Sequence, residues 1–346
     1  MSLSELAARL EALHLFHDRE TGLVAAIAVD DTRLGPPRGG TRLRAYPDLL
    51  DGAREAARLA RGMTCKFAIH GLPFGGGKAV LLQDEAGARD RALLEARLRA
   101  YGRCLERLGG HFATGPDFGV GPAEVAVIRE VTPLALGEHG SRAGEATAAG
   151  VRVALELALA EAGRGVEGAR IAVLGVGAVG GPLARQLAAR GARLLLADPD
   201  PARLEPLAAE LGAETAPAAE APLAEVDALA PCAVGELFDL ATVARLRARV
   251  VVGAANDQLV DAGAAAAALA ARGIVHVPDY VANGGAAVVL SAKLTGGAEA
   301  EVEVAEARIR ETTARVLARA RARDETPWAA ALALVDEVLA GARPQA

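Results

Sequence analysis

A short glycine-rich turn between two apolar segments restricts the fold of this 346-residue chain more than any other feature. The segment IAVLGVGAVG places Gly175, Gly177 and Gly180 in the spacing G-x-G-x-x-G, after a predicted strand at 170–174 and before a predicted helix. A second apolar strand is predicted at 193–197, and it completes a βαβ unit. The pattern therefore predicts a doubly wound parallel sheet in this part of the chain.

The same turn predicts a dinucleotide site. Glycine at these positions allows a tight turn, lets the backbone approach a pyrophosphate and leaves the amide groups of a helix N-terminus for the anion. Asp198 ends the next strand, where a carboxylate would bind the hydroxyls of the adenosine ribose. The alternative for Asp198 is a helix cap or a solvated loop acid. Asp200 would repel a 2′-phosphate, so NAD is the predicted cofactor, although Arg203 keeps NADP open.

Length and composition predict a second domain. A chain of 346 residues exceeds one ordinary core, and its 52% hydrophobic content with only 3% aromatic residues suits helices packed on buried sheets. We expect an α/β protein with an N-terminal substrate-binding and oligomerisation domain at 1–143 and a Rossmann-type dinucleotide-binding domain at 144–317. The polar, glycine-rich segment 136–145 is the predicted hinge, and the helical segment 318–346 is predicted to pack back onto the first domain.

Hydrophobic periodicity predicts the other elements. An amphipathic helix, rather than a signal peptide, is predicted over residues 1–20. A helix is predicted to run from Thr147 to Ala169 in the second domain. The remaining predicted helices lie at 50–61, 89–108 and 179–189, and the remaining strands at 23–29, 79–82, 228–229, 250–252 and 274–277.

Charge and cysteine content exclude several classes of function. The net charge of -6 gives no general attraction to nucleic acid, and no basic run is interleaved with aromatic residues. Cys65, Cys104 and Cys232 are far apart and include no C-x-x-C pair, which argues against a disulfide framework and a zinc site. No apolar run is long enough to span a membrane. We therefore expect a cytoplasmic protein without nucleic-acid or membrane partners.

The segment GLPFGGGKAV sets Lys78 after three glycines. It is not a Walker A loop, because Ala79 occupies the position of the magnesium-binding hydroxyl. We interpret the glycines as making room for a ligand against the backbone, with Lys78 directed into a cleft. A lysine acts as a base when burial or a neighbouring cation lowers its pKa, and Lys66 can supply that cation or hold a substrate carboxylate. Asp117, in the loop ATGPDFGVG, completes a predicted catalytic set.

Eight motifs carry a family resemblance over nearly the whole chain. They are GPPRGGTRL (35–43), RGMTCKFAIHGLPFGGGKAV (61–80), ATGPDFG (113–119), ATAAGV (146–151), GVGAVGGPLA (175–184), APCAVG (230–235), GAANDQL (253–259) and PDYVANGG (278–285). In these motifs and their order the sequence resembles the glutamate, leucine, phenylalanine and valine dehydrogenase superfamily. It is nearest to the leucine and phenylalanine branch.

The resemblance implies an NAD-dependent oxidative deamination of an L-amino acid to a 2-oxo acid and ammonia, and the reverse reductive amination. It implies no metal, and it implies a homo-oligomer built through the first domain. Lys78 and Asp117 would carry the proton chemistry, and Lys66 would bind the α-carboxylate with the backbone of Gly39 and Gly40. Asn283 would lie beside the α-carbon and amino group of the substrate. The implied cofactor contacts are Gly175, Gly177, Ala178, Val179, Gly180, Asp198, Thr147, Ala230, Pro231, Cys232 and Asn256.

The side-chain pocket departs from the family pattern at several positions. Arg38 stands where the leucine and phenylalanine enzymes carry an apolar residue and the glutamate enzymes a lysine, whereas Leu290 replaces the serine of the glutamate enzymes. Gly115 and Ala287 are small and suggest room for a bulky or aromatic side chain. We expect an apolar substrate of the leucine, valine or phenylalanine type. The alternatives are an acidic substrate held by Arg38, a structural salt bridge for Arg38, and an NAD-binding regulator without activity.

Overall fold

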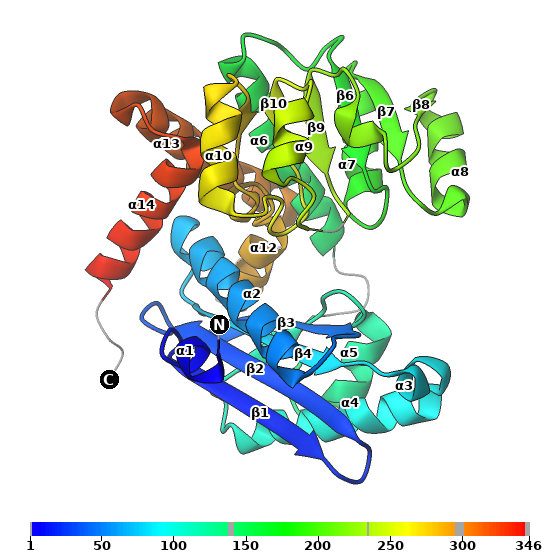
Figure 1. Cartoon of the computed structure of the whole chain (residues 1–346), viewed down its shortest axis with the longest axis vertical. Coiled ribbons are helices and arrows are strands. Elements are labelled where there is room, and N and C mark those ends of the chain that lie inside the picture. The colour runs from blue at the N-terminus through cyan, green and yellow to red at the C-terminus, as the bar shows by residue number, and fades with distance from the viewer. Residues whose placement is uncertain (1, 138–141, 234, 295–300, 343–346) are drawn as a thin grey trace. The chain divides into compact units, whose positions relative to one another are not determined.

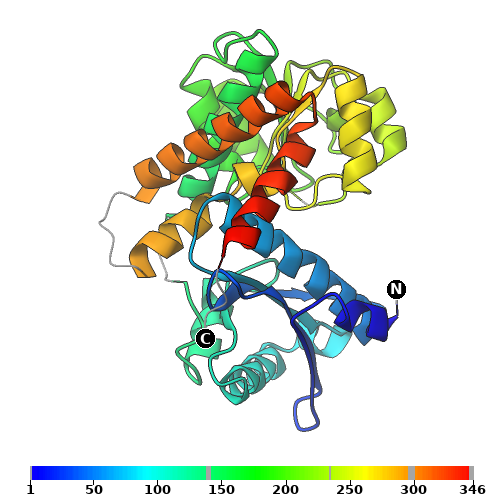
Figure 2. The same ribbon diagram turned by 90° about the vertical axis from the view of Figure 1, so that its left-hand side faces the viewer.

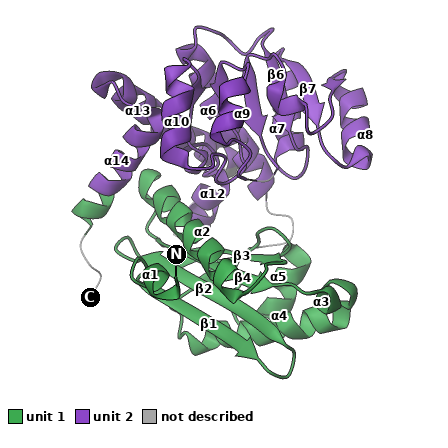
Figure 3. Ribbon diagram, in the orientation of Figure 1, with its two compact units in different colours: residues 1–141, 338–346 green, residues 142–337 purple. Residues whose placement is uncertain are grey.

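The computed structural model describes residues 2–137, 142–233, 235–294 and 301–342, which fold into two compact units (Figures 1 and 3). The first unit comprises residues 1–141 with 338–346, and the second comprises residues 142–337. Residues 138–141 of the predicted hinge lie outside the described residues. The domain limits predicted from the sequence remain a prediction, and so does the packing of 318–346 onto the first domain.

The first unit is built on a mixed five-stranded sheet in the order β1-β2-β4-β3-β5. β1 and β2 are antiparallel, β2 is antiparallel to β4, and β3 runs parallel to both β4 and β5. The strands are β1 (Ala12–Asp18), β2 (Leu23–Asp31), β3 (Pro37–Arg44), β4 (Gly75–Leu82) and β5 (Ala113–Gly115).

Both faces of this sheet are covered by helices, because its central strands are apolar on both sides. Ala25 and Ile27 of β2 face a core that includes α4 and α5, whereas Ala26 and Ala28 pack with alanines of α2. The helices are α1 (Leu3–Ala7), α2 (Leu49–Ile69), α3 (Glu85–Arg89), α4 (Arg91–Arg107) and α5 (Pro122–Arg129). Since Val80 belongs to the α2 side, the alternation of β4 puts Lys78 on that side as well.

Two predicted helices were too long. The first ends at Ala7, and Ala12–Asp18 forms strand β1, whose residues pair with β2 from Ala12 opposite Val29 to Asp18 opposite Leu23. Leucines in this stretch fit a helical period, but as a strand the segment packs Leu13 against one core of the first unit and Phe16 against the other. The helix predicted from Thr147 to Ala169 ends at Glu161, because the chain turns at glycines with positive φ.

The second unit contains a parallel six-stranded sheet in the order β11-β10-β9-β6-β7-β8, which confirms the doubly wound prediction. The strands are β6 (Arg170–Leu174), β7 (Arg193–Ala197), β8 (Glu214–Thr215), β9 (Ala228–Pro231), β10 (Val250–Val251) and β11 (Val275–His276). Because the strands are parallel, their carboxyl ends lie at one edge of the sheet. That edge carries the G-x-G-x-x-G turn, Asp198 and the loops after β9 and β10.

Helices enclose the second sheet. The core beside β6, β7, β9 and β10 includes side chains of α9 and α10, whereas α13 packs along α6 (Figure 2). The helices are α6 (Ala143–Glu161), α7 (Gly180–Ala188), α8 (Pro201–Leu211), α9 (Leu240–Arg245), α10 (Ala262–Ala271), α11 (Asp279–Ala282), α12 (Gly285–Leu294), α13 (Glu301–Arg323) and α14 (Pro327–Gly341), with a 3-10 turn at Ala221–Leu223. Within the described ranges, no helix has the length and apolarity needed to cross a membrane.

Candidate active site

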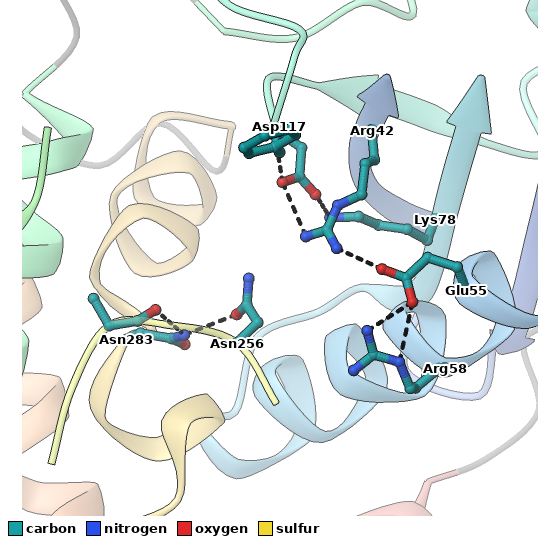
Figure 4. Close-up of polar contacts among 9 residues, drawn as sticks. Arg42, Glu55, Arg58, Lys78, Asp117, Asn256 and Asn283 are labelled. Carbon is teal, nitrogen blue, oxygen red and sulfur yellow. Dashed lines mark hydrogen bonds and ion pairs between the residues drawn. The ribbon is translucent and has the colours of Figure 1, made fainter. Parts of the chain in front are cut away.

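In the first unit, Lys78 and Asp117 form a buried ion pair (Figure 4). Lys78 lies in β4 and is 5% exposed, and its Nζ contacts Oδ2 of Asp117. Asp117 belongs to the loop after β5, and the backbone N–H of Phe118 donates to its Oδ1 at 2.6 Å. The fold thus brings two predicted catalytic residues into direct contact, although they come from separate segments.

Arg42 of β3 also contacts this carboxylate, with 3.4 Å between its Nη2 and Oδ1 of Asp117. Burial raises the pKa of Asp117, but the positive charges of Lys78 and Arg42 outweigh burial and hold that pKa well below its usual value. Asp117 is therefore ionised at neutral pH. Sequence reasoning missed Arg42. The signal available was the alternation of β3, which sets Gly40 and Arg42 on one face, beside Val80 of β4.

The three glycines before Lys78 have a packing role. A Cβ on Gly75 would lie 2.5 Å from the carbonyl oxygen of Asp31, and one on Gly77 would lie 2.8 Å from the ring of Phe112. At Gly76 it would collide with Thr64 of α2. The space beside these glycines is thus filled by the chain itself, and our interpretation of it as room for a ligand was wrong. The glycines let α2 and neighbouring loops approach the strand that carries Lys78.

Gly40 limits the position of the ion pair. A Cβ at Gly40 would lie 2.9 Å from Cβ of Asp117 and 3.3 Å from Nζ of Lys78. A Cβ at Gly39 would collide with the carbonyl of Gly77 in the neighbouring strand. In the parallel register of β3 with β5, Gly40 is opposite Gly115. Small residues are therefore required where three segments meet.

Two further basic residues of the predicted site lie in the first unit. Lys66 is half-buried in the last turn of α2. The half-buried Arg38 lies in β3, with its guanidinium carbon 4.8 Å from the centre of the Phe74 ring. Burial lowers the pKa of Arg38, and its Nε is buried without a hydrogen-bond partner among the described residues. Nothing in these contacts supports the salt bridge considered for Arg38.

In the second unit, the turn after β6 has the shape that a pyrophosphate site needs. Gly175 has φ +94°, and a Cβ there would lie 2.6 Å from Cβ of Ala233. A Cβ on Gly180 would collide with the carbonyl of Gly175. A Cβ on Gly177 would meet no atom within 4 Å, so this side of the turn is open. Ala178 is exposed and Val179 is the N-cap of α7, so the turn leads directly into a helix N-terminus.

Asp198 fixes the same turn. Its Oδ2 accepts the backbone N–H of Val176 at 2.8 Å, and its Oδ1 accepts that of Asp200 at 2.9 Å. Each carboxylate oxygen has a second lone pair, so Asp198 can still accept hydrogen bonds from ribose hydroxyls. Arg203, the residue that kept NADP open, forms an ion pair with Asp200 at 3.1 Å. The charges at this strand end therefore suit an unphosphorylated ribose.

Polar side chains meet near the carboxyl end of β10. Asn283 is 6% exposed, and its Nδ2 donates to the carbonyl of Ala254 at 2.9 Å and to Oδ1 of Asn256 at 2.8 Å (Figure 4). Its Oδ1 is buried and has no hydrogen-bond partner in the described part of the chain. Thr147 of α6 donates to the carbonyl of Ala143 at 2.9 Å and accepts the N–H of Ala286 at 3.2 Å. Asn283 thus offers a fixed acceptor.

The remaining predicted site residues of the second unit lie at the end of β9 and in α12. Ala230 and Pro231 end β9, and the N–H of Cys232 donates to the carbonyl of Leu174 at 2.8 Å. Burial raises the pKa of Cys232 to about 12, so its thiol is neutral at physiological pH. Ala287 and Leu290 are half-buried in α12, three residues apart and on one face of the helix.

Comparison with known proteins gives independent information on both units. The family described as "Glu/Leu/Phe/Val dehydrogenase, dimerisation domain" matches residues 12–133, and the family "NADP oxidoreductase coenzyme F420-dependent" matches residues 170–257. The chain is 34% identical to an L-tryptophan dehydrogenase of Nostoc punctiforme over 81% of this chain and 79% of that protein. It is 37% identical to a leucine dehydrogenase of Geobacillus stearothermophilus over 81% of this chain and 77% of that protein.

Solved structures agree with these matches. The crystal structure of the L-tryptophan dehydrogenase from Nostoc punctiforme aligns with a TM-score of 0.80 at 30% identity and covers 98% of this chain and 99% of that one. A hetero-hexameric glutamate dehydrogenase from Thermus thermophilus aligns with a TM-score of 0.80 at 26% identity, covering 98% of this chain and 90% of that one.

Proposed function

Because the chain belongs to the glutamate/leucine/phenylalanine/valine dehydrogenase family and is an amino acid dehydrogenase, we propose that it oxidatively deaminates an apolar L-amino acid with NAD. The products are the 2-oxo acid and ammonia, and the reverse reaction is the reductive amination. The observation that carries this proposal is the buried pair of Lys78 and Asp117, because a proton donor and a proton acceptor held together in a dry site suit acid–base chemistry.

The substrate must be held before its α-hydrogen can leave. The ammonium group of Lys66 and the backbone of Gly39 and Gly40 bind the α-carboxylate in this proposal, which fixes the α-carbon. The amino group must be neutral so that its lone pair assists the loss of hydride. The unpartnered Oδ1 of Asn283 is an acceptor suited to an N–H of that amino group. A ligand there would complete the hydrogen bonding of a buried amide.

Lys78 and Asp117 then move the protons. Loss of hydride turns the substrate into an iminium ion, and water adds to its carbon while Lys78, as the neutral amine, takes a proton from that water. The resulting carbinolamine loses ammonia when a proton reaches its nitrogen, and Asp117 relays this proton. Asp117 is held ionised beside Lys78, so its negative charge stabilises the ammonium that forms when Lys78 takes up the proton.

The family's nicotinamide dinucleotide fits the second unit. The open side of Gly177 and the N-terminus of α7 suit its pyrophosphate, and Asp198 suits its adenosine ribose. Thr147 and Asn256 are the residues proposed to orient the nicotinamide. When bound, the nicotinamide ring takes up the hydride from the α-carbon. We propose NAD rather than NADP because Asp198 and Asp200 are acidic and Arg203 is paired with Asp200.

An apolar substrate is supported by the names of the relatives and by the residue types at the positions proposed to contact the substrate side chain. The relatives above act on tryptophan and on leucine by name, and Gly115, Ala287 and Leu290 present no charge. The second candidate is an acidic amino acid. It is favoured by one observation, the half-buried guanidinium of Arg38 with its unpartnered Nε, which a side-chain carboxylate could satisfy. The contact with the Phe74 ring already stabilises this cation in part.

The test is NADH formation by the purified protein with leucine, valine, phenylalanine, tryptophan, glutamate and aspartate in turn, at mildly alkaline pH. A clear preference for an apolar amino acid supports the proposal, and Arg38→Leu should then leave that preference intact. Preference for glutamate or aspartate, abolished by Arg38→Leu, would establish the second candidate. Binding of NAD without its reduction by any amino acid would instead indicate a regulator without activity.

We also propose that the protein is a homo-oligomer assembled through its first unit. The matched family is described as a dimerisation domain, and the glutamate dehydrogenase of similar fold is named hetero-hexameric. Light scattering of the purified protein measures the mass directly. A mass close to the 35.2 kDa of one chain at micromolar concentration would contradict this proposal.

A further inference from the structure

Arg42 lies between the carboxylates of Glu55 and Asp117 and contacts both (Figure 4). Its Nη1 is 2.6 Å from Oε1 of Glu55, and its Nη2 is 3.4 Å from Oδ1 of Asp117. The side chains of Arg42 and Asp117 are each 13% exposed. The second oxygen of Glu55 pairs with Arg58 at 2.7 Å, and Arg58 is 36% exposed. Alternating charges therefore run from Lys78 to the surface of α2.

We propose that Arg42 is a positioning residue of the reaction, which holds one oxygen of Asp117 so that the other stays on Lys78, and which Glu55 holds in turn. The inference rests on the proposed function, because it gives Lys78 and Asp117 the roles described above. It adds a residue that touches neither substrate nor cofactor in that proposal. Arg42 acts only through Asp117.

The two oxygens of the Asp117 carboxylate have different partners. Oδ1 of Asp117 receives the N–H of Phe118 and the guanidinium of Arg42, whereas Oδ2 contacts Lys78. Bonds on both sides fix the plane of the carboxylate. Lysine could not hold two carboxylates in this way, because only arginine has a planar fork with several N–H groups in fixed directions. Without Arg42, the N–H of Phe118 is the remaining contact of Oδ1 among the described residues, and a carboxylate held at that oxygen by one bond turns more freely about it, which moves Oδ2 away from Lys78.

Glu55 holds the guanidinium of Arg42 in place. A lone buried cation beside the ion pair would compete with Lys78 for Asp117, but Glu55 binds Arg42 at the shorter distance. Arg42 is thus anchored on α2 and makes only a longer contact with Asp117. Alanines of α2 pack against β2 and β4, and β3 pairs with β4, so both elements of the anchor belong to the packed sheet of the first unit.

Tyr46 is a further titratable group near the Asp117 carboxylate. Tyr46 follows β3, and burial together with the negative charge of Glu55 raises the pKa of its phenol to about 12. The exposed Arg44 is a further charged group near Tyr46. The positive charges that act most strongly on the Asp117 carboxyl are those of Lys78 and Arg42, and Glu55 and Arg58 follow Arg42 in the chain of ion pairs.

The first test compares Arg42→Met, Arg42→Lys and the control Arg44→Met, which removes an exposed arginine from the same strand. We expect Arg42→Met to lower kcat roughly 10- to 100-fold while the KM for the amino acid changes little, since only the proton chemistry is misplaced. Arg42→Lys restores the charge without the fork and should recover part of the rate. Arg44→Met should keep the normal rate. Added guanidinium should raise the rate of Arg42→Ala, which separates a lost cation from a damaged fold.

The second test does not depend on turnover. Removing the cation of Arg42 must raise the pKa of Asp117, because it takes away one of the two positive charges that oppose burial. Infrared spectroscopy of protein with labelled aspartate measures the pH at which the Asp117 carboxylate band disappears, and Asp117→Asn identifies that band. We expect this pH to rise in Arg42→Met but not in Glu55→Gln, because the loss of Glu55 removes a negative charge and leaves the cation of Arg42 in place. This result stands even if no amino acid is ever oxidised.

The outcomes are distinct for the two proposals. If the wild type oxidises an amino acid and Arg42→Met matches its kcat, Arg42 has no positioning role. An unchanged Asp117 titration in Arg42→Met overturns the inference even if the variant is slow or less stable. If the wild type oxidises no amino acid but the Asp117 titration shifts as expected, the proposed function fails and the contact between Arg42 and Asp117 is upheld.

Discussion

Gly40 shows how one backbone position limits the chemistry of a whole site. An added Cβ there would lie 2.7 Å from the carbonyl oxygen of Pro116, besides its short distances to Asp117 and Lys78. We expect Gly40→Ala to displace the ion pair and to lower kcat roughly 100-fold. Gly62→Ala is the matched control, because a Cβ at Gly62 in α2 meets no atom within 4 Å and alanine favours the helix. A Gly40→Ala enzyme with normal kcat would show that the pair tolerates displacement.

Replacing Lys78 tests the proposed base directly. Lys78→Ala removes the proposed base, which lies in the first unit, whereas the dinucleotide is proposed to bind in the second unit. We expect at least a roughly 100-fold loss of turnover, with NAD affinity unchanged in a fluorescence titration. Arg91→Ala, which changes an exposed side chain of α4, is the control for general effects on the first unit. Turnover near the normal rate in Lys78→Ala would remove this lysine from its role.

At the scale of elements, strand β11 contains a buried histidine that makes stability depend on pH. His276 is buried, and neither ring nitrogen has a hydrogen-bond partner among the described residues. Burial lowers its pKa from 6.5 to about 4, so the unfolded chain binds the proton more tightly. The stability that this neutral ring contributes is present above pH 6.5 and is lost as the pH falls toward 4.

We therefore expect the free energy of unfolding to fall by about 2 kcal/mol between pH 7.5 and pH 5 through His276 alone. His276→Leu should remove this part of the pH dependence in denaturant titrations at the two pH values. His17→Gln, at an exposed position of β1, should leave it unchanged. The same loss of stability in His276→Leu and in the wild type would assign the pH dependence to other groups.

Some elements and site residues could be predicted from the sequence, and others depend on three-dimensional packing. The strands of the second unit were predictable, because β6 and β7 are short apolar runs separated by glycines and a helix. Strand β1 was not, since its leucines fit a helical period and only pairing with β2 decides between the two. Lys78 and Asp117 could be selected from their glycine-rich surroundings. Arg42 could not, because its partner Glu55 lies on a helix whose position above β3 is set by packing in three dimensions.

On the scale of the whole molecule, each unit has its own apolar core. Clusters around Ile27 and around Ala28 belong to the first unit, and a cluster around Leu229 belongs to the second. The residues proposed for proton transfer lie in the first unit, and those proposed for the dinucleotide lie in the second. A unit with a separate core and a complete set of binding residues can fold and bind alone. Cofactor binding and proton chemistry should therefore be separable.

We accordingly expect a fragment of residues 142–337 to unfold cooperatively and to bind NADH but to catalyse no amino acid oxidation. Its affinity for NADH should exceed that for NADPH, because Asp198 and Asp200 repel a 2′-phosphate and Arg203 is already paired. Calorimetry measures the unfolding, and quenching of nicotinamide fluorescence measures binding. Asp198→Ala should weaken binding in the fragment and in the whole chain alike, because Asp198 holds the N–H of Val176 in the glycine turn. A folded fragment that binds neither dinucleotide would mean that the binding residues of the second unit do not form a site by themselves.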